Sequence, residues 1–213
     1  MKIAYFALTD EGINTAMRVR DKIGGTLEPK EGFKEAVYEN FHKCDALVFV
    51  MATGIVVRTV APLLVGKSTD PAVIVIDQKG NFVISLLSGH LGGANRLAKH
   101  IAAEIGAIPV ITTATDVQGV ISFDEFAKDN GLVIENLSEL KYISSAILKG
   151  ERVGLVSDCP VNIPEVPPEV TVTDAPTGKI RVIVSDRTSK KYQDGSEHAL
   201  LLRPKSIVIG IGC

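Results

Sequence analysis

Short runs of valine, isoleucine and other apolar residues alternate with stretches of helical periodicity through the first half of the chain. Near-continuous apolar strands that alternate with helices are typical of a largely parallel sheet covered on both faces. The pattern therefore predicts an α/β fold. The apolar runs span residues 2–8, 46–51, 72–77, 82–87 and 109–114.

One pair of these runs is expected to be antiparallel. Residues 72–77 and 82–87 are joined only by "QKGN", a tight loop that contains Gly80. A loop this short favours a hairpin, so the sheet should be mixed and largely parallel, covered by helices. The clearest helical pattern follows, because apolar residues recur at helical spacing from Ala94 to Ile105 and Gly106 then marks a stop.

The sequence pattern of the chain changes after about Asn136. A helical pattern is followed by two copies of one strand-plus-turn pattern, "RVGLVSD" and "RVIVSD". They are separated by a segment with five prolines, which we expect to form a connection or edge strands. We predict an N-terminal α/β domain over 1–136 and a smaller central α/β domain over 137–203. Residues 204–213 begin a new strand, and we expect them to start a truncated C-terminal domain.

Composition excludes several classes of function. The net charge is −2 from 23 basic and 25 acidic residues, without a block of like charge, so we expect no nucleic-acid partner. The three cysteines are scattered without metal-ligand spacing, which argues against a metal site or a disulfide framework. Since neither a signal peptide nor an apolar run of membrane-spanning length is found, we expect a cytoplasmic protein with no membrane partner.

The stretch "SGHLGGAN", residues 88–95, lies where an apolar run turns into the helical pattern. Backbone N–H groups at the start of a helix have no internal partner, and glycines there allow a ligand to approach closely. A carboxylate or an oxyanion would suit such a site, and the alternative is a tight strand-to-helix turn without a ligand. The glycine spacing matches neither a dinucleotide-binding loop nor a P-loop, so nucleotide binding is not expected.

His90 lies among these glycines. A histidine can serve near neutral pH as an acid, a base, an anion partner or a metal ligand. The alternative is a histidine that is simply solvated in a loop. Because no nucleophile elbow surrounds Ser88 and no metal-binding motif is present, the simplest chemistry is activation of water by His90 or Asp116.

Two further polar loops follow strands of the predicted sheet. Thr53 and Gly54 are placed to open a helix, and Arg58 follows among apolar residues, where it needs an anion from either a protein carboxylate or a ligand. The other loop, "TTATD" at 112–116, offers hydroxyls and one carboxylate for a ligand, or merely caps the next turn. We expect all three loops to share one edge of the sheet and to form a pocket there.

Together these stretches resemble the CbiG family of cobalamin biosynthesis, the cobalt-precorrin-5A hydrolases. The resemblance covers nearly the whole chain and is tightest from Ala46 to Asp116. Family members commonly continue past "GIGC" into a further domain, so we expect that domain to be missing here. The resemblance rests on "ATGIVVRTVAPLL", "DPAVIVIDQKGNFVISLLSGHLGGANRLA", "PVITTATD", "GERVGLVSD" and the terminal "LRPKSIVIGIGC".

The resemblance implies hydrolytic opening of the δ-lactone of cobalt-precorrin-5A, a tetrapyrrole edged with acetate and propionate groups, to give cobalt-precorrin-5B and acetaldehyde. His90 would act on the water or on the lactone carbonyl, with Asp116 nearby. Cobalt would arrive with the substrate, so no protein-bound cofactor is expected. Arg58 and Arg96 would bind peripheral carboxylates. The full set of expected substrate-binding residues is Thr53, Gly54, Arg58, Ser88, Gly89, Gly92, Gly93, Asn95, Arg96, Thr113 and Thr115.

Two other functions stay open from the sequence. One is a corrinoid-binding component without catalysis of its own, which needs the C-terminal domain from a separate chain. The other is a generic α/β protein that binds a small molecule. The protein partners to expect are a second copy of this chain in a homo-oligomer, or that separate C-terminal chain.

Overall fold

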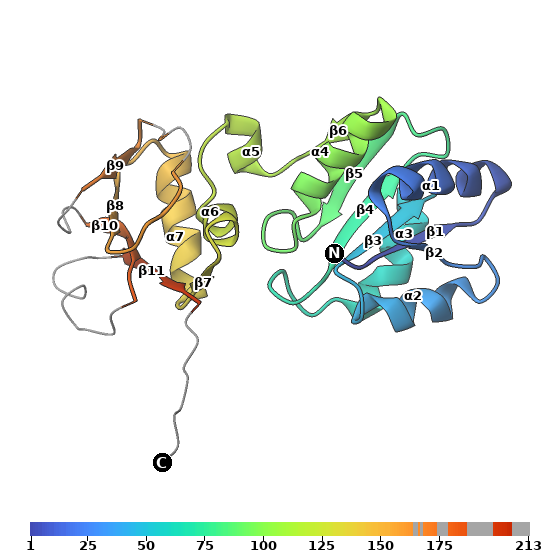
Figure 1. Ribbon diagram of the computed structural model, residues 1–213, viewed down its shortest axis with the longest axis horizontal. Helices are drawn as coiled ribbons and strands as arrows, with labels where there is room; N and C mark the ends of the chain where they lie inside the picture. The colour runs from blue at the N-terminus through green and yellow to red at the C-terminus, as the bar shows by residue number, and fades with distance from the viewer. Residues whose placement is uncertain (164–165, 167, 174–178, 187–197, 206–213) are drawn as a thin grey trace, which may run out of the picture. The chain divides into compact units, whose positions relative to one another are not determined.

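The chain folds into two compact units, Met1–Thr113 and Ala114–Cys213, each with its own sheet (Figure 1). The predicted boundary at residue 136 is wrong, because residues 123–134 contribute to the core of the second unit. The predicted start of a C-terminal domain falls mostly on residues 206–213, which lie outside the described part of the chain. The computed structural model describes residues 1–163, 166, 168–173, 179–186 and 198–205.

The sheet of the first unit is mixed, as predicted. Its strands are β1 (Ile3–Ala7), β2 (Thr26–Leu27), β3 (Ala46–Val50), β4 (Ala72–Ile76), β5 (Phe82–Leu87) and β6 (Ile108–Val110). In the described residues they follow the order β2-β1-β3-β4-β5-β6. All neighbouring pairs are parallel except β4 and β5, which form the expected hairpin. Strands β5 and β6 therefore run opposite to β1–β4.

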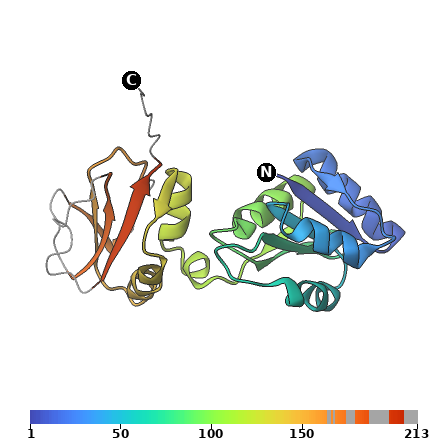
Figure 2. The same ribbon diagram turned by 90° about the horizontal axis from the view of Figure 1, so that it is seen from below.

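Helices cover both faces of this sheet (Figure 2). Helices α1 and α4 pack against one set of alternate strand residues, among them Tyr5 and Val48. Helices α2 and α3 pack against the other set, which includes Phe6 and Phe49. This two-sided burial explains why the strands read as continuous apolar runs. The helices are α1 (Asp10–Ile23), α2 (Phe33–Phe41), α3 (Thr53–Val60) and α4 (Ala94–Ile105), and the short 3-10 helix η1 (Ala61–Leu63) follows α3.

Tyr5 is expected to make the first unit less stable at alkaline pH. Its side chain is fully buried, its hydroxyl donates to the Gly24 carbonyl over 2.9 Å, and burial raises its pKa to about 12, partly offset by Arg20. The pKa of Tyr5 in the folded state exceeds the unfolded value of about 10. The contribution of the protonated Tyr5 hydroxyl to the free energy of unfolding is therefore complete below pH 10 and is lost between about pH 10 and 12.

We expect the wild-type chain to lose about 1 kcal/mol more stability than Tyr5→Phe on going from pH 8 to pH 11, because only the wild type releases a proton on unfolding. Urea unfolding followed by circular dichroism measures the difference. Tyr38→Phe is the matched control, since Tyr38 is exposed. Parallel pH curves for the wild type and Tyr5→Phe would contradict the prediction.

The second unit is a smaller α/β unit. Its strands are β7 (Leu132–Ile134), β8 (Val153–Ser157), β9 (Val170–Val172), β10 (Ile180–Val184) and β11 (His198–Pro204), and its helices are α5 (Ala114–Gln118), α6 (Phe123–Asp129) and α7 (Leu137–Leu148). In the described residues the sheet order is β7-β11-β10-β8-β9, and only β7 is antiparallel to its neighbour. None of the helices in the described residues has the length and the apolar character that crossing a membrane requires.

The two strand-plus-turn patterns of the second unit form the adjacent parallel strands β8 and β10, in which Val182 is the partner of Leu155. The proline-rich segment contributes β9 at the edge of the sheet, which confirms the expectation of an edge strand.

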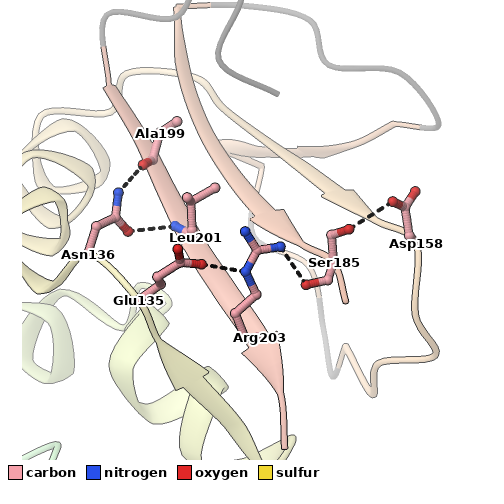
Figure 3. A network of polar contacts seen from close by, with 7 residues as sticks. All are labelled: Glu135, Asn136, Asp158, Ser185, Ala199, Leu201 and Arg203. Carbon is pink, nitrogen blue, oxygen red and sulfur yellow. Dashed lines mark hydrogen bonds and ion pairs between the residues drawn. The ribbon is translucent and has the colours of Figure 1, made fainter. Parts of the chain in front are cut away.

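A polar network joins the start of α7 to the strands of the second unit (Figure 3). The Asn136 amide donates to the Ala199 carbonyl over 2.7 Å and accepts from the Leu201 N–H over 2.8 Å. Arg203 donates to the Ser185 carbonyl over 2.9 Å and also pairs with Glu135. The Asn136 side chain therefore continues the β7–β11 ladder where β7 ends.

Asn136→Ala is expected to lower the free energy of unfolding of the second unit by about 2 kcal/mol, because a backbone donor and a backbone acceptor of β11 lose their partner. Urea unfolding and hydrogen exchange in β11 measure the loss. Ser138→Ala, at an exposed position of the same helix, should leave both unchanged. Equal stability of the two variants would show that Asn136 is not needed.

Candidate functional site

The loop of residues 88–93 connects β5 to α4 and folds back on the helix end. Ser88 and Gly93 both have a positive φ, 57° and 86°. The N–H of Ala94 donates to the Ser88 carbonyl over 3.1 Å, and that of Asn95 donates to the Gly89 carbonyl over 3.0 Å. Two N–H groups that were expected to face a ligand are therefore used by the loop itself. In this respect the alternative of a tight strand-to-helix turn is the correct one.

The glycines of this loop are required by close packing. A Cβ on Gly92 would lie 2.7 Å from the Ser88 carbonyl oxygen and would also overlap the Ser88 Cβ. A Cβ on Gly89 would lie 2.9 Å from Oδ1 of Asn95. Ordinary side chains do not fit at these separations, so glycine keeps the loop compact.

The buried side chain of Asn95 supports the loop through hydrogen bonds. That side chain is only 2% exposed. The Ser85 hydroxyl donates to Oδ1 of Asn95 over 2.7 Å, and Nδ2 of Asn95 donates to the Thr113 hydroxyl over 2.8 Å. These contacts join β5, α4 and the residues that follow β6. Asn95 and Thr113, both predicted to bind substrate, thus lie together and hold the loop in place.

His90 lies near the middle of this loop and is half-buried. A half-buried histidine on a packed loop is held more firmly than a solvated one, and it can still exchange protons with a bound molecule. His90 is therefore not a fully solvated loop residue, and its role in acid or base chemistry stays a prediction. The loop therefore offers one group suited to acid or base chemistry on a rigid support.

The prediction that all three polar loops lie at one edge of the sheet is wrong. Leu87 at the end of β5 is paired with Val73 near the start of β4, whereas Val50 at the end of β3 is paired with Ile76 at the end of β4. The loop after β3 therefore lies at the opposite edge from His90. The β4–β5 hairpin is the cause, since it reverses the direction of the chain.

Thr53, Gly54 and Arg58 lie at that opposite edge, where Thr53 begins α3 as predicted. Arg58 is exposed, and its guanidinium donates to the Gly54 carbonyl over 3.0 Å. Among the residues that the structure describes, no carboxylate pairs with Arg58. Of the two alternatives for Arg58, a protein carboxylate is therefore not found in the described residues, and a ligand anion stays a prediction. Thr53, Gly54 and Arg58 do not join His90 in one pocket.

The "TTATD" stretch is divided between the two units. Thr113 ends the first unit, whereas Thr115 and Asp116 belong to α5 in the second. Thr115 is buried and Asp116 is half-buried. A role of Asp116 beside His90 stays a prediction, and so does the supply of cobalt by the substrate. Within the described residues, no three histidine, cysteine, aspartate or glutamate side chains are grouped in a way that could hold a metal ion.

Two family models match the chain, one in each half. The model described as "Cobalamin synthesis G N-terminal" matches residues 35–116. The model described as "Cobalamin biosynthesis central region" matches residues 121–204. The two matches meet close to the division between the units and include the His90 loop.

Curated relatives and a solved structure are similar to the same region. The chain is 39% identical over 186 residues to the cobalt-precorrin-5A hydrolase of Priestia megaterium, covering 81% of this chain and 50% of that protein. It is 40% identical over 166 residues to the same enzyme of Salmonella typhimurium, covering 72% of this chain and 47% of that protein. The chain therefore spans about half the length of the curated relatives it matches.

The fold is similar to the crystal structure of a cobalamin biosynthesis protein G homologue from Sulfolobus solfataricus. The TM-score is 0.62 at 24% identity, and the match covers 95% of this chain and 60% of that chain. At this identity the likeness concerns the fold alone, and it agrees with the predicted α/β class.

Proposed function

This chain belongs to the CbiG family of cobalamin biosynthesis, of which it carries the N-terminal and central regions, and from that premise we propose that it takes part in hydrolysis of cobalt-precorrin-5A. The observation that carries the proposal is the pair of family matches, which accounts for most of both units. The identity of about 40% to two cobalt-precorrin-5A hydrolases supports it.

In the proposed reaction one water molecule adds to the lactone carbonyl of the substrate. The acyl–oxygen bond breaks, which gives a carboxylate and an alcohol. The carbon that bears the alcohol then leaves as acetaldehyde, and the macrocycle takes up a proton in its place to give cobalt-precorrin-5B. Cobalt is part of the substrate throughout.

His90 is the residue of the first unit best suited to the hydrolytic step. The loop that carries it is packed through Gly89 and Gly92 and is supported by Asn95. A fixed histidine can take the proton of an attacking water or protonate the leaving alcohol, and fixed placement lowers the entropic cost of reaching the transition state. We assign that proton transfer to His90.

Incubation of the purified chain with cobalt-precorrin-5A tests the function. We expect acetaldehyde to form, as measured by NADH oxidation with alcohol dehydrogenase, and the absorbance spectrum of the corrinoid to change in parallel. The same assay without the protein corrects for spontaneous release. Absence of both acetaldehyde and corrinoid binding would contradict the proposal and favour a generic α/β binding protein.

A corrinoid-binding component is the second candidate, favoured by the fact that the chain spans about half of its curated relatives. Corrinoid binding without acetaldehyde release would support it. Addition of the remaining region of a relative as a separate chain should then restore release. A homo-oligomer and a cytoplasmic location belong to the same proposal, and light scattering and cell fractionation test them.

A further inference from the structure

A cavity of about 510 Å³ lies in the first unit beside the start of α4. Its size is within the range of pockets that hold small molecules or parts of larger ones. It is lined by residues of β1, α1 and α4 and by Met1. The lining residues are Met1, Ile3, Ile23, Arg96, Leu97 and His100.

The cavity is amphipathic. Ile3 and Leu97 are 5% and 6% exposed, and Ile23 is half-buried, so they form an apolar floor. Arg96 and His100 are exposed and stand four residues apart on α4. Side chains at this spacing lie on the same face of a helix, close enough to contact one group together. An apolar stem that ends in an anion matches this arrangement.

The charges around the cavity also favour an anion. No acidic side chain is among its described lining residues. Glu104 lies one helical turn beyond His100, but it pairs with Lys22 of α1 over 3.7 Å. The nearest carboxylate on this face of α4 is thus already compensated. Arg96 and His100 are therefore the basic side chains that the described lining of the cavity presents to a ligand carboxylate.

The cavity belongs to the same region as His90. Arg96 lies in the first turn of α4, three residues beyond Gly93, where the loop ends. The end of β5 lies at the sheet edge where β4 starts, and β3 and β1 start at that edge too. Arg96 therefore lies close to the loop that carries His90, whereas Ile3 lies at the same sheet edge and is separated from β5 by β3 and β4.

The geometry points to this cavity as the site that anchors one peripheral carboxylate side chain of the tetrapyrrole. Arg96 and His100 bind the carboxylate, and its methylene stem lies against Ile3, Ile23 and Leu97. The inference rests on the proposed function and deepens it, because it assigns positioning to His100 and an apolar floor to the stem. An acetate or propionate held here leaves the macrocycle beside the His90 loop.

Arg96→Gln and His100→Gln test this assignment, with Lys99→Gln as the matched control. Lys99 lies between them on α4 but does not line the cavity. We expect each of the first two variants to raise the KM for cobalt-precorrin-5A about tenfold, with kcat changed less than about threefold, since binding without transition-state selectivity is lost. Lys99→Gln should match the wild type.

Absorbance titration gives a second readout that does not depend on turnover. The dissociation constant for cobalt-precorrin-5A should rise about tenfold in Arg96→Gln and His100→Gln. A cobalt corrinoid whose peripheral carboxylates are amidated should bind the wild type and both variants alike. Circular dichroism should be unchanged, because both replaced side chains are exposed.

Wild-type affinity in Arg96→Gln and His100→Gln would overturn the inference while leaving the proposed function intact. An equal loss in Lys99→Gln would also overturn it, because the effect would then reflect overall charge. A fall in kcat at constant KM would assign these residues to the chemical step instead of anchoring. Failure of the wild type to bind or convert the substrate would reject the proposed function itself.

Discussion

Gly92→Ala is expected to lower the free energy of unfolding of the first unit by about 3 kcal/mol. The added Cβ would lie 2.7 Å from the Ser88 carbonyl oxygen, which is backbone and cannot turn away. That carbonyl also accepts from the Ala94 N–H, so a shift of Ser88 would disturb the start of α4. Urea unfolding measures the loss, and hydrogen exchange over residues 82–105 should localise it.

Gly66→Ala is the matched control for this substitution. The space around Gly66 is open to 4 Å, and its φ is not positive. An alanine there should change the free energy of unfolding by less than about 0.5 kcal/mol. If Gly92→Ala were as stable as Gly66→Ala, the loop would be less tightly packed than the structure describes, and His90 would have no rigid support.

His90→Gln is expected to reduce kcat for acetaldehyde release by roughly 10²- to 10⁴-fold with little change in KM. Glutamine keeps hydrogen-bonding groups but cannot exchange a proton near neutral pH. The steady-state assay with cobalt-precorrin-5A measures both constants. This outcome would separate the proton-transfer role of His90 from the anchoring role of Arg96 and His100.

His42→Gln controls for loss of a histidine elsewhere, since His42 is exposed at the end of α2. Its kcat should equal that of the wild type. If His90→Gln releases acetaldehyde at the wild-type rate, His90 is an ordinary loop residue. A rise in KM with constant kcat would instead make His90 a binding residue.

The strands and helices that face the core could be predicted from the sequence, because strands buried on both faces appear in it as continuous apolar runs. The loop "QKGN" was sufficient to predict the hairpin of β4 and β5. Its consequence for the site was missed, since a hairpin turns the carboxyl end of β5 toward the opposite edge from that of β3. Grouping Arg58 with His90 assumed that all strands end at one edge.

Other features depend on contacts that no local pattern records. Asn95 follows the glycines and looks available to a ligand, yet tertiary packing turns its amide inward to Ser85 and Thr113. The boundary inside "TTATD" arises because residues 123–134 find their core partners in the second unit. The spacing of Arg96 and His100 was visible on the polar face of the helix, but the apolar floor needs β1 and α1.

The β4–β5 hairpin also bears on how the chain reaches its native state. Its closure spans only the turn from Asp77 to Phe82, whereas β1 must find β3 across the whole of α1 and α2. Short closures lose less chain entropy and form faster than long parallel pairings. We therefore expect the hairpin and the adjoining α4 to form early and the parallel strands to join later, so that the loop which carries His90 is assembled within the folding nucleus.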